Sequence, residues 1–435
     1  MLDIFVLLCY TLSYDIVLFL MNIGEGTMDT KKAKALFNNA SKKIYNSKLT
    51  AYLVPLISLS IYLIYLIADG RITKVTGYYL IHYLYTFDHG FISRGLVGEI
   101  ISRFADVVTP EITQTAVIIF TVMLLVAASL CIGYAFNRVK NDSVRFRYVL
   151  LLIIVLCILP ISFKSYFVDI KLDKILWALT FFAVLLSENK IGIWFTPLLC
   201  LLATTVNPVF LFCSMILISI VLLQLFYDNH YSLKNGIICA VAYLSMIAMG
   251  IFSAASEKFT GFTSGMEMVE YYFSRYPEPL TESEKIWFAE ECLFDFFEPL
   301  NVVLKQSFQI YFIEWECGIS FVLNLIFAAV PIYALLIYFW KKASAFEDNK
   351  FQKFIFSLCA VSPIVTVLPI ILSWESSKYF GNNILVQLCL IVYYVVHNNQ
   401  AVVNALDSIT ARAKEHKLVS IAVIVYFSLL LKEFI

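Results

Sequence analysis

The amino-acid sequence predicts an all-α protein: a polytopic transmembrane helical bundle of about eleven spans with external amphipathic surface helices. Hydrophobic residues make up 60% of the 435 residues, charged residues only 15%, and the mean hydropathy is +0.81. Aromatic residues account for 16%, which is typical of chains that cross many membrane–water interfaces. The formal net charge is zero, so no basic field attracts nucleic acid. The composition therefore excludes a soluble enzyme, a disordered scaffold and a nucleic-acid binder.

Apolar runs of roughly 20 residues are long enough to span a bilayer. The sequence contains eleven candidate runs, near residues 50–68, 113–136, 148–163, 174–187, 191–206, 208–226, 235–255, 318–339, 354–373, 382–397 and 418–431. The continuous apolar stretch from Ile191 to Phe226 is too long for one crossing. The pair Asn207-Pro208 lies in its middle, and proline disfavours helix in the residue before it. We therefore expect a tight external hairpin of two short helices.

The distribution of Lys and Arg predicts the orientation, because cytoplasmic loops contain the excess of these residues. The segments that would lie inside carry 19 of the 32 Lys and Arg, including six between residues 28 and 48. We therefore expect a protein of the bacterial cytoplasmic (inner) membrane whose N-terminus, counted from Met28, lies on the cytoplasmic side. We expect residues 28–435 to form a single multi-pass domain whose active face is extracytoplasmic.

The first 27 residues are interpreted as an extension that does not belong to the natural protein. They are hydrophobic but contain no Lys or Arg, so they lack the basic start of a signal peptide. Gly24-Glu25-Gly26 is what a purine-rich bacterial ribosome-binding site would encode if it were translated, and Met28 begins a sequence typical of a cytoplasmic start. The alternative is a twelfth span of unusual composition, and N-terminal sequencing that found Met1 would favour it.

Two connecting segments, 69–112 and 256–317, are much longer than a connection requires, and such loops in compact folds are usually functional or disordered. The second segment contains twelve acidic residues against four basic ones. Its apolar stretches predict helices on the membrane surface with an acidic face toward water. Cys292 and Cys317 both lie in this segment and would form a disulfide only if their Cα atoms approached closely.

The first long segment contains the most informative polar residues of the chain. Its start predicts a short helix on the membrane face with an apolar stripe made of Tyr78, Tyr79, Leu80, Tyr83 and Leu84. Asp88, His89 and Arg94 follow in a turn rich in glycine, a residue that permits close backbone approach or positive φ.

Each polar residue of this turn has a predicted role. A helix that begins near Ser93 would direct free amides toward an anion, and Arg94 would bind a phosphate beside it. Asp88 then serves as a general base or a metal ligand, and His89 orients a substrate hydroxyl. The alternative is a structural ion pair between Asp88 and Arg94.

Further polar residues lie near predicted span ends at the outer face. Asp169 and Asp173 are four residues apart, with Asp173 the better supporting residue; the alternative is a solvated helix cap. Glu375 and Lys378 follow the ninth span, where Lys378 could bind phosphate or form a simple ion pair with Glu375. Asn207 is a further supporting residue, for which capping of the broken backbone is favoured.

These features together resemble the GT-C class of membrane glycosyltransferases. The resemblance rests on the many spans, the inside N-terminus and the acid in a long first external loop, within Phe87-Asp-His-Gly-Phe-Ile-Ser-Arg-Gly-Leu-Val-Gly98. It covers roughly the N-terminal half, and that loop contains no Asp-x-Asp, Asp-Glu or Glu-Asp pair. It implies that Asp88 is catalytic and that the donor is a polyprenyl-phosphate sugar. It leaves open whether a divalent cation, Mg²⁺ or Mn²⁺, is needed, and the sequence predicts no set of residues that would hold such a cation in the resting protein.

The resemblance implies transfer of a sugar to an extracytoplasmic cell-envelope glycan or lipid, in polysaccharide biosynthesis, with membrane lipids as surroundings. Two non-enzymatic alternatives remain: a lipid-linked glycan flippase or transporter, and a structural subunit of an envelope assembly. The near absence of charge within the spans argues against ion-coupled transport, in which carboxylates usually mark the path.

Overall fold

The fold was derived from a computed structural model of the chain. It describes residues 48–70, 75, 77–92, 94–158, 170–212, 214–230, 232–256, 261–293, 330–366 and 376–418, together with a few isolated residues. The interpretation of residues 1–27, the Cys292–Cys317 pairing and the last predicted span fall largely or wholly outside the described residues or side chains.

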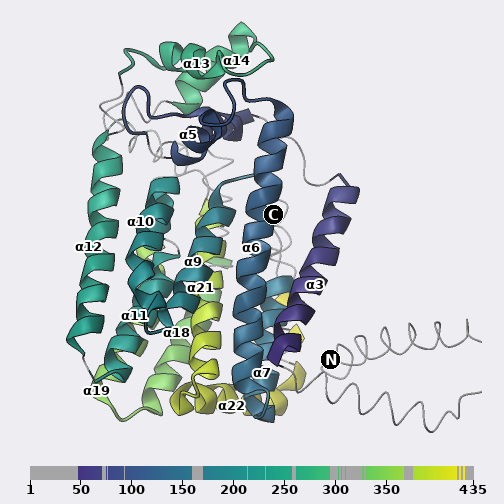
Figure 1. Cartoon of the computed structure of the whole chain (residues 1–435). Coiled ribbons are helices and arrows are strands. Elements are labelled where there is room, and N and C mark those ends of the chain that lie inside the picture. The colour runs from purple at the N-terminus through teal and green to yellow at the C-terminus, as the bar shows by residue number, and fades with distance from the viewer. Residues whose placement is uncertain are drawn as a thin grey trace, which may run out of the picture.

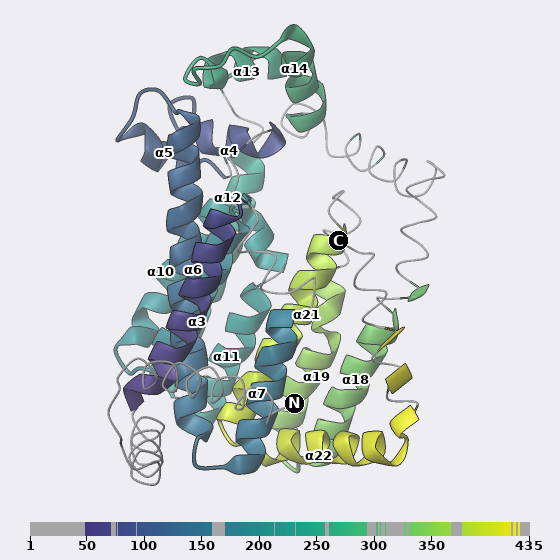
Figure 2. The same ribbon diagram turned by 90° about the vertical axis from the view of Figure 1, so that its right-hand side faces the viewer.

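All the regular secondary structure of the described residues is helical, and these residues contain no strand. The longer helices stand side by side as a bundle (Figures 1 and 2). They are α3 (Lys48–Ala68), α6 (Pro110–Val139), α7 (Ser143–Ile158), α9 (Asp173–Ser187), α10 (Thr196–Val206), α11 (Met215–Asp228), α12 (Leu233–Ser256), α18 (Val330–Ala345), α19 (Lys350–Val361) and α21 (Ser376–Val396).

The remaining helices, which are shorter except for the 16-residue α22, occupy the ends of the bundle and the breaks between its helices. They are η1 (Gly77–Leu80), α4 (Ile81–Leu84), α5 (Leu96–Ser102), η2 (Gly192–Phe195), η3 (Pro208–Phe212), α13 (Gly265–Phe273), α14 (Glu282–Trp287), η5 (Phe288–Cys292), η8 (Ser362–Thr366) and α22 (Gln400–Glu415). We call the end that carries α4, α5, α13 and α14 the cap, and the opposite end, along which α22 lies, the base (Figure 1).

Four of the described helices are long and apolar enough to cross a membrane. They comprise Leu49–Ala68, Pro110–Val139, Leu233–Ser253 and Tyr379–Val396. The other predicted spans coincide with shorter helices, such as α9 with 15 residues, or extend beyond the described residues. The membrane class of the sequence prediction thus has structural support, and the count of eleven spans stays a prediction.

The chain reverses direction at Asn207-Pro208, as the sequence predicts. α10 ends at Val206, η3 begins at Pro208, and α11 then returns toward the base. The apex of this hairpin is buried within the protein, since the Asn207 side chain is only 5% exposed. Asn207 packs against the first turn of α9, to which it donates a hydrogen bond. That the hairpin lies on the external side of a membrane stays a prediction.

The close packing of α3 on α6 depends on Gly133. A Cβ atom added at this position would lie 2.2 Å from the ring of Tyr52 and 2.9 Å from the Tyr52 Cα. Glycine is therefore required where the two helices touch. Away from α6, α3 exposes a row of large apolar side chains: Leu53, Val54, Ile57, Ile61 and Ile64.

At the cap, the two long connecting segments pack on each other. Tyr272 of α13 donates a hydrogen bond of 3.2 Å to the carbonyl of Thr86, and Arg275 donates one of 3.0 Å to the carbonyl of Leu84. The amide of Val108 in turn donates to the Arg275 carbonyl at 2.8 Å. The sequence does not indicate that the two segments contact each other, whereas in the structure they form one layer.

Candidate active site

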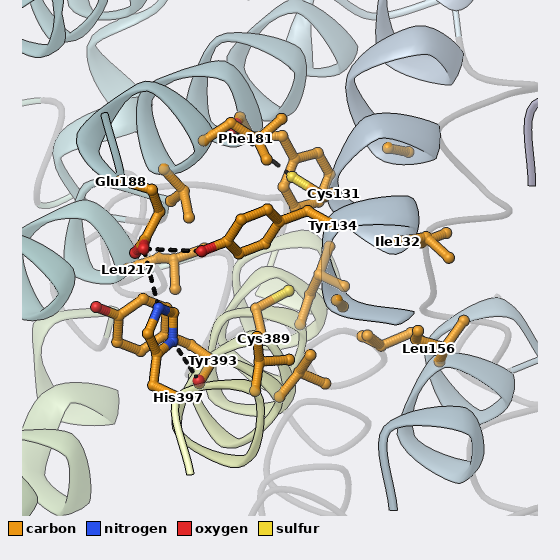
Figure 3. Close-up of a pocket in the computed structure, with 18 residues that line it drawn as sticks. Cys131, Ile132, Tyr134, Leu156, Phe181, Glu188, Leu217, Cys389, Tyr393 and His397 are labelled. Carbon is orange, nitrogen blue, oxygen red and sulfur yellow. Dashed lines mark hydrogen bonds and ion pairs between the residues drawn. The ribbon is translucent and has the colours of Figure 1, made fainter. Parts of the chain in front are cut away.

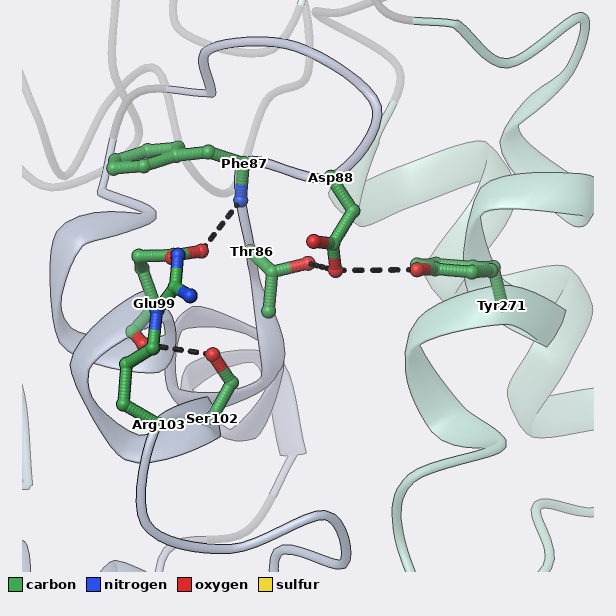
Figure 4. Close-up of polar contacts among 7 residues, drawn as sticks. All are labelled: Thr86, Phe87, Asp88, Glu99, Ser102, Arg103 and Tyr271. Atoms are coloured by element: carbon green, nitrogen blue, oxygen red, sulfur yellow. Dashed lines mark hydrogen bonds and ion pairs between the residues drawn. The ribbon is translucent and has the colours of Figure 1, made fainter.

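The carboxylate of Asp88 is exposed at the cap, and residues of both long segments hold it in place (Figure 4). Thr86 donates a hydrogen bond from its hydroxyl to Oδ2 of Asp88 at 2.7 Å. Tyr271 of α13 donates a second one to the same oxygen at 3.3 Å. Since only Oδ2 accepts these bonds, the carboxylate is oriented by its neighbours while it faces water.

These contacts hold the pKa of Asp88 below its ordinary value of 3.8. The hydrogen bond from Thr86 is the largest cause. The hydrogen bond from Tyr271 and the positive charges of Arg275 and His89 lower the pKa further, against an opposing effect of burial. Burial and the Asp88 charge raise the pKa of Tyr271, so its phenol remains a donor at neutral pH. Asp88 is therefore ionised near neutral pH.

Three glycines shape the turn, as the sequence predicts. Gly90 has φ of 109°, which side chains rarely allow. A Cβ atom on Gly95 would lie 2.8 Å from the ring of Phe87, and one on Gly98 would lie 2.2 Å from the carbonyl oxygen of Tyr85. α5 can thus lie directly against the backbone that leads into the turn.

Glu99 of α5 fixes the start of the same turn (Figure 4). Its Oε2 accepts a hydrogen bond of 3.0 Å from the amide of Phe87, the residue before Asp88. Its other oxygen forms an ion pair with Arg103. Glu99 directly follows the motif quoted above, but the sequence does not indicate that its carboxylate reaches back to Phe87.

His89 lies next to Asp88, but its ring packs between aromatic side chains. The ring centroids of Phe262 and Tyr271 are 4.6 and 4.4 Å away. The backbone carbonyl of His89 accepts a hydrogen bond of 3.0 Å from the amide of Gly261. His89 therefore helps to join the two segments, and its predicted contact with a substrate hydroxyl remains a prediction.

Contrary to the sequence prediction, Arg94 does not lie in the first turn of a helix. α5 begins at Leu96, three residues after the start that the sequence predicts near Ser93. Arg94 itself has φ of 68°, and its Nη1 lies 3.3 Å from Nε2 of His82, a buried residue of α4. The helix start is shifted because Arg94 has left-handed backbone geometry, which a helix of L-residues disfavours.

The apolar residues near these short helices do not form simple surface stripes. Three residues of the first predicted stripe, Leu80, Tyr83 and Leu84, are buried rather than exposed on the surface. In α5, Val97 is 3% exposed, whereas Ile100 is 52% exposed. The cap segments thus pack on the bundle and on each other, which the sequence pattern alone does not predict.

A second group of polar residues is buried below the cap. Asp173 is 2% exposed and Lys174 is fully buried in the first turn of α9. Oδ1 of Asp173 accepts a hydrogen bond of 3.3 Å from Asn207, and Nζ of Lys174 donates one of 2.8 Å to Thr121. Asp173 is therefore not a solvated cap at the outer face, because the neighbouring helices α6 and α10 cover it.

Asn207 has the capping role favoured from the sequence. Its Oδ1 accepts a hydrogen bond of 3.1 Å from the amide of Val209, in the helix break, while its amide group binds Asp173. One side chain thus satisfies the broken backbone and a buried carboxylate.

We expect Asn207→Ala to lower the free energy of unfolding by about 1–3 kcal/mol, because buried hydrogen-bonding groups at Asp173 and Val209 lose their partner. Thr205→Ala is the control, since its hydroxyl contacts only the carbonyl of Leu201 in its own helix. Thermal unfolding in detergent measures both variants. Equal loss of stability in the two would contradict the role of Asn207.

The cap site and the buried group are linked through α4. Tyr83 of α4 donates a hydrogen bond of 2.8 Å to the carbonyl of Ile170, three residues before Asp173. His82, the partner of Arg94, is the preceding residue in α4. The four-residue helix α4 thus contacts Arg94 directly and, through Ile170, the segment that leads into Asp173.

The remaining predicted residues cannot be placed in this way. Asp169 and Glu375 lie outside the described residues, and Lys378 lies in the first turn of α21 with its side chain outside them. Asn382, one helical turn further along α21, accepts a hydrogen bond of 2.8 Å from Trp177 of α9. The backbone position of Lys378 is thus near that contact along α21.

Among the described residues, no group of three or more His, Cys, Asp or Glu is arranged to hold a metal ion. The nearby Glu99 carboxylate is already bound by the amide of Phe87 and by Arg103. A divalent cation at Asp88 would therefore take its other ligands from substrate and water, which is common for Mg²⁺.

No family model matches this chain, and neither a curated protein nor a solved structure matches it.

Proposed function

We propose that this chain is a membrane glycosyltransferase that moves a sugar from a polyprenyl-phosphate donor to an extracytoplasmic cell-envelope glycan or lipid. The observation that carries the proposal is the ionised Asp88 carboxylate, which the two long segments orient at one end of an apolar bundle. An exposed carboxylate beside apolar helices suits a reaction between a lipid-anchored donor and an acceptor that arrives from water. The resemblance of the sequence to the GT-C class assigns the catalytic carboxylate to the same residue.

In the proposed reaction, the acceptor hydroxyl attacks the anomeric carbon of the donor. The new C–O bond forms as the bond between that carbon and the phosphate oxygen breaks. The hydroxyl proton passes to Asp88, and polyprenyl phosphate leaves with the bonding electron pair. A single attack of this kind inverts the anomeric centre.

Cationic residues are proposed to stabilise the charge that develops on the leaving phosphate. Arg94 and Lys378 keep this role as proposals. Arg275 supplies a positive charge close to Asp88, where it lowers the carboxyl pKa. Because Asp88 has a low pKa, acceptor binding must displace the hydrogen bond from Thr86 or Tyr271 to make the carboxylate a stronger base.

This requirement gives a pH prediction. Thr86→Val removes the largest cause of the low Asp88 pKa, so the acid limb of the transfer rate should move to higher pH. The sign follows because the lost hydrogen bond favours the charged carboxylate. Tyr271→Phe should cause a smaller upward movement. pH profiles of kcat/KM for the purified variants measure this, and an unmoved acid limb in both would contradict the assignment of Asp88.

The proposal is tested with the purified full chain in lipid vesicles that contain polyprenyl-phosphate sugars and glycan or lipid acceptors. Mass spectrometry should detect an acceptor that is heavier by one sugar residue. A panel of donors with different sugars keeps the test independent of any one substrate. Absence of every such product, with the protein folded, would overturn the proposal.

A lipid-linked glycan flippase is the second candidate, and the buried Asp173 and Lys174 favour it, because ionisable residues within spans often mark a transport path. The same vesicles distinguish the two functions. A flippase moves labelled lipid-linked sugar between leaflets and forms no glycosidic bond.

A further inference from the structure

A pocket of about 120 Å³ lies among α6, α7, α9, α11 and α21, on the base side of the bundle (Figure 3). Its walls are almost entirely apolar and include Cys131, Phe181, Leu217 and Cys389. Apolar cavities of about 150 Å³ in proteins stay dry and bind small apolar molecules. The size and the lining of this pocket thus suit a hydrocarbon group.

Polar side chains gather at one end of this pocket (Figure 3). Glu188, which follows α9, accepts a hydrogen bond of 2.9 Å from Tyr134 of α6 and one of 3.0 Å from Nε2 of His397, which follows α21. Nδ1 of His397 lies 2.8 Å from the carbonyl of Tyr393. The polar end is therefore built from the ends of three different segments.

Two polar atoms at this end lack hydrogen-bond partners among the described residues. Both hydrogen bonds to Glu188 reach Oε2, and Oε1 is buried without a partner, as is the hydroxyl of Tyr393, which also lines the pocket. The Tyr134 hydroxyl also accepts from Arg138, and both nitrogens of His397 have partners. A buried carboxylate oxygen without a partner costs free energy, and a donor in the pocket would remove that cost.

The pocket can be reached from the apolar side of the bundle. Its lining residues Ile132, Ile153 and Leu156 are only partly buried. Neighbouring side chains on α6 and α7, Leu130 and Leu151, are exposed and apolar. Because α6 is long and apolar enough to span a membrane, a molecule that enters here would come from lipid rather than from water.

We propose that this pocket binds the hydroxyl end of a long-chain alcohol, whose O–H donates to Oε1 of Glu188 while its hydrocarbon chain lies along the apolar wall. A carboxylic acid fits poorly, because its carboxylate would face the Glu188 carboxylate. An ammonium fits poorly too, because the pairing of Glu188 with His397 already balances the charge.

Glu188 keeps its accepting form at neutral pH. Burial raises its pKa, but hydrogen bonds from His397 and Tyr134 outweigh that effect and leave the pKa below its usual value of 4.5. Burial lowers the pKa of His397, whereas its contacts with Glu188 raise it, and the raised value prevails.

This site is separate from the Asp88 site. Glu188 follows the last residue of α9, and Asp173 is its first, so the 15-residue helix sets them about 22 Å apart along the bundle. The inference therefore holds whether or not the chain transfers sugars, and the two proposals fail independently.

The test uses the purified full chain in detergent, a long-chain alcohol with a photoreactive diazirine on its chain, and peptide mapping. Label should enter peptides of α6 and α21. We expect 1-dodecanol to compete at a concentration at least tenfold lower than dodecane or dodecanoic acid. Equal competition by dodecane, or label outside the pocket, would overturn the proposal.

Two variants measure separately how much the Glu188 carboxylate and the apolar cavity contribute to binding of the alcohol. Glu188→Gln should weaken competition by dodecanol at least tenfold, because a neutral acceptor replaces a charged one. If that variant does not fold, Cys389→Phe, which fills the pocket from α21, should abolish labelling. Ile119→Phe, on the exposed side of α6 and nine residues before the first lining residue, Ala128, is the control and should leave labelling unchanged. Unchanged labelling in the folded Cys389→Phe variant would also overturn the proposal.

Natural sources of the alcohol are distinguished by two further competitors, an isoprenoid alcohol and a diacylglycerol. Both present a hydroxyl on a hydrocarbon body. Preferential competition by either one supports the proposal and identifies the source, and failure of both together with dodecanol would refute it.

Discussion

Asp88→Asn is expected to lower sugar transfer by about 10²–10⁴-fold, the usual contribution of a general base. The amide keeps the size of the side chain and can still accept from Thr86 and Tyr271, the two hydroxyls that orient it. It cannot take the proton of the acceptor hydroxyl. The loss should therefore appear in kcat, with expression and thermal stability close to those of the unaltered protein.

The matched control is Asp106→Asn in the same long segment. Asp106 is exposed. The same change of charge at this position should leave the rate within about twofold, because a surface substitution of this kind removes no proton acceptor from the site. Retained activity in Asp88→Asn, with a normal control, would remove Asp88 from the chemistry.

Gly98→Ala should cause the largest loss of folded protein among single-methyl changes at the cap. The added Cβ would lie 2.2 Å from the carbonyl oxygen of Tyr85 and 2.9 Å from that of Tyr83. Both neighbours are backbone atoms, which cannot move aside as a side chain can. Overpacking in buried regions costs about 1–3 kcal/mol or more, and here α5 must separate from α4.

Thermal unfolding and the yield of monodisperse protein measure this effect. Gly236→Ala in α12 is the control, because its Cβ would meet only the ring of Phe226, at 3.3 Å, and alanine favours helix over glycine. The control should be neutral or slightly stabilising. Comparable stability of the two variants would mean that α5 does not lie as close to α4 as described.

The sequence predicts the Asp88 turn well, because the reasons are local. Glycine spacing, a lone acid and a long segment are visible in the residues themselves, and Gly90, Gly95 and Gly98 have the predicted backbone roles. Tyr271, in contrast, is 183 residues from Asp88, and nothing in the many acids of its segment distinguishes one tyrosine. Such a contact arises from tertiary packing, which periodicity does not encode.

The same limit left two interpretations of Asp173 open. Its position at the start of an apolar run fits a solvated cap and a buried polar contact equally well. The second outcome depends on where the hairpin apex at Asn207 packs. The Glu188–His397 pair was missed for a related reason, because both residues lie in short connections that appear solvated in the sequence.

The central structural claim is that the two long segments meet at the Asp88 turn, and a disulfide tests it most directly. A Cβ atom at Gly261 would lie 3.5 Å from the Cβ of His89, within the range that a disulfide requires. The double variant His89→Cys, Gly261→Cys should form this cross-link on mild oxidation, detected as one linked peptide pair by mass spectrometry. Failure to cross-link in folded protein, with both single variants open to thiol labelling, would contradict the claim.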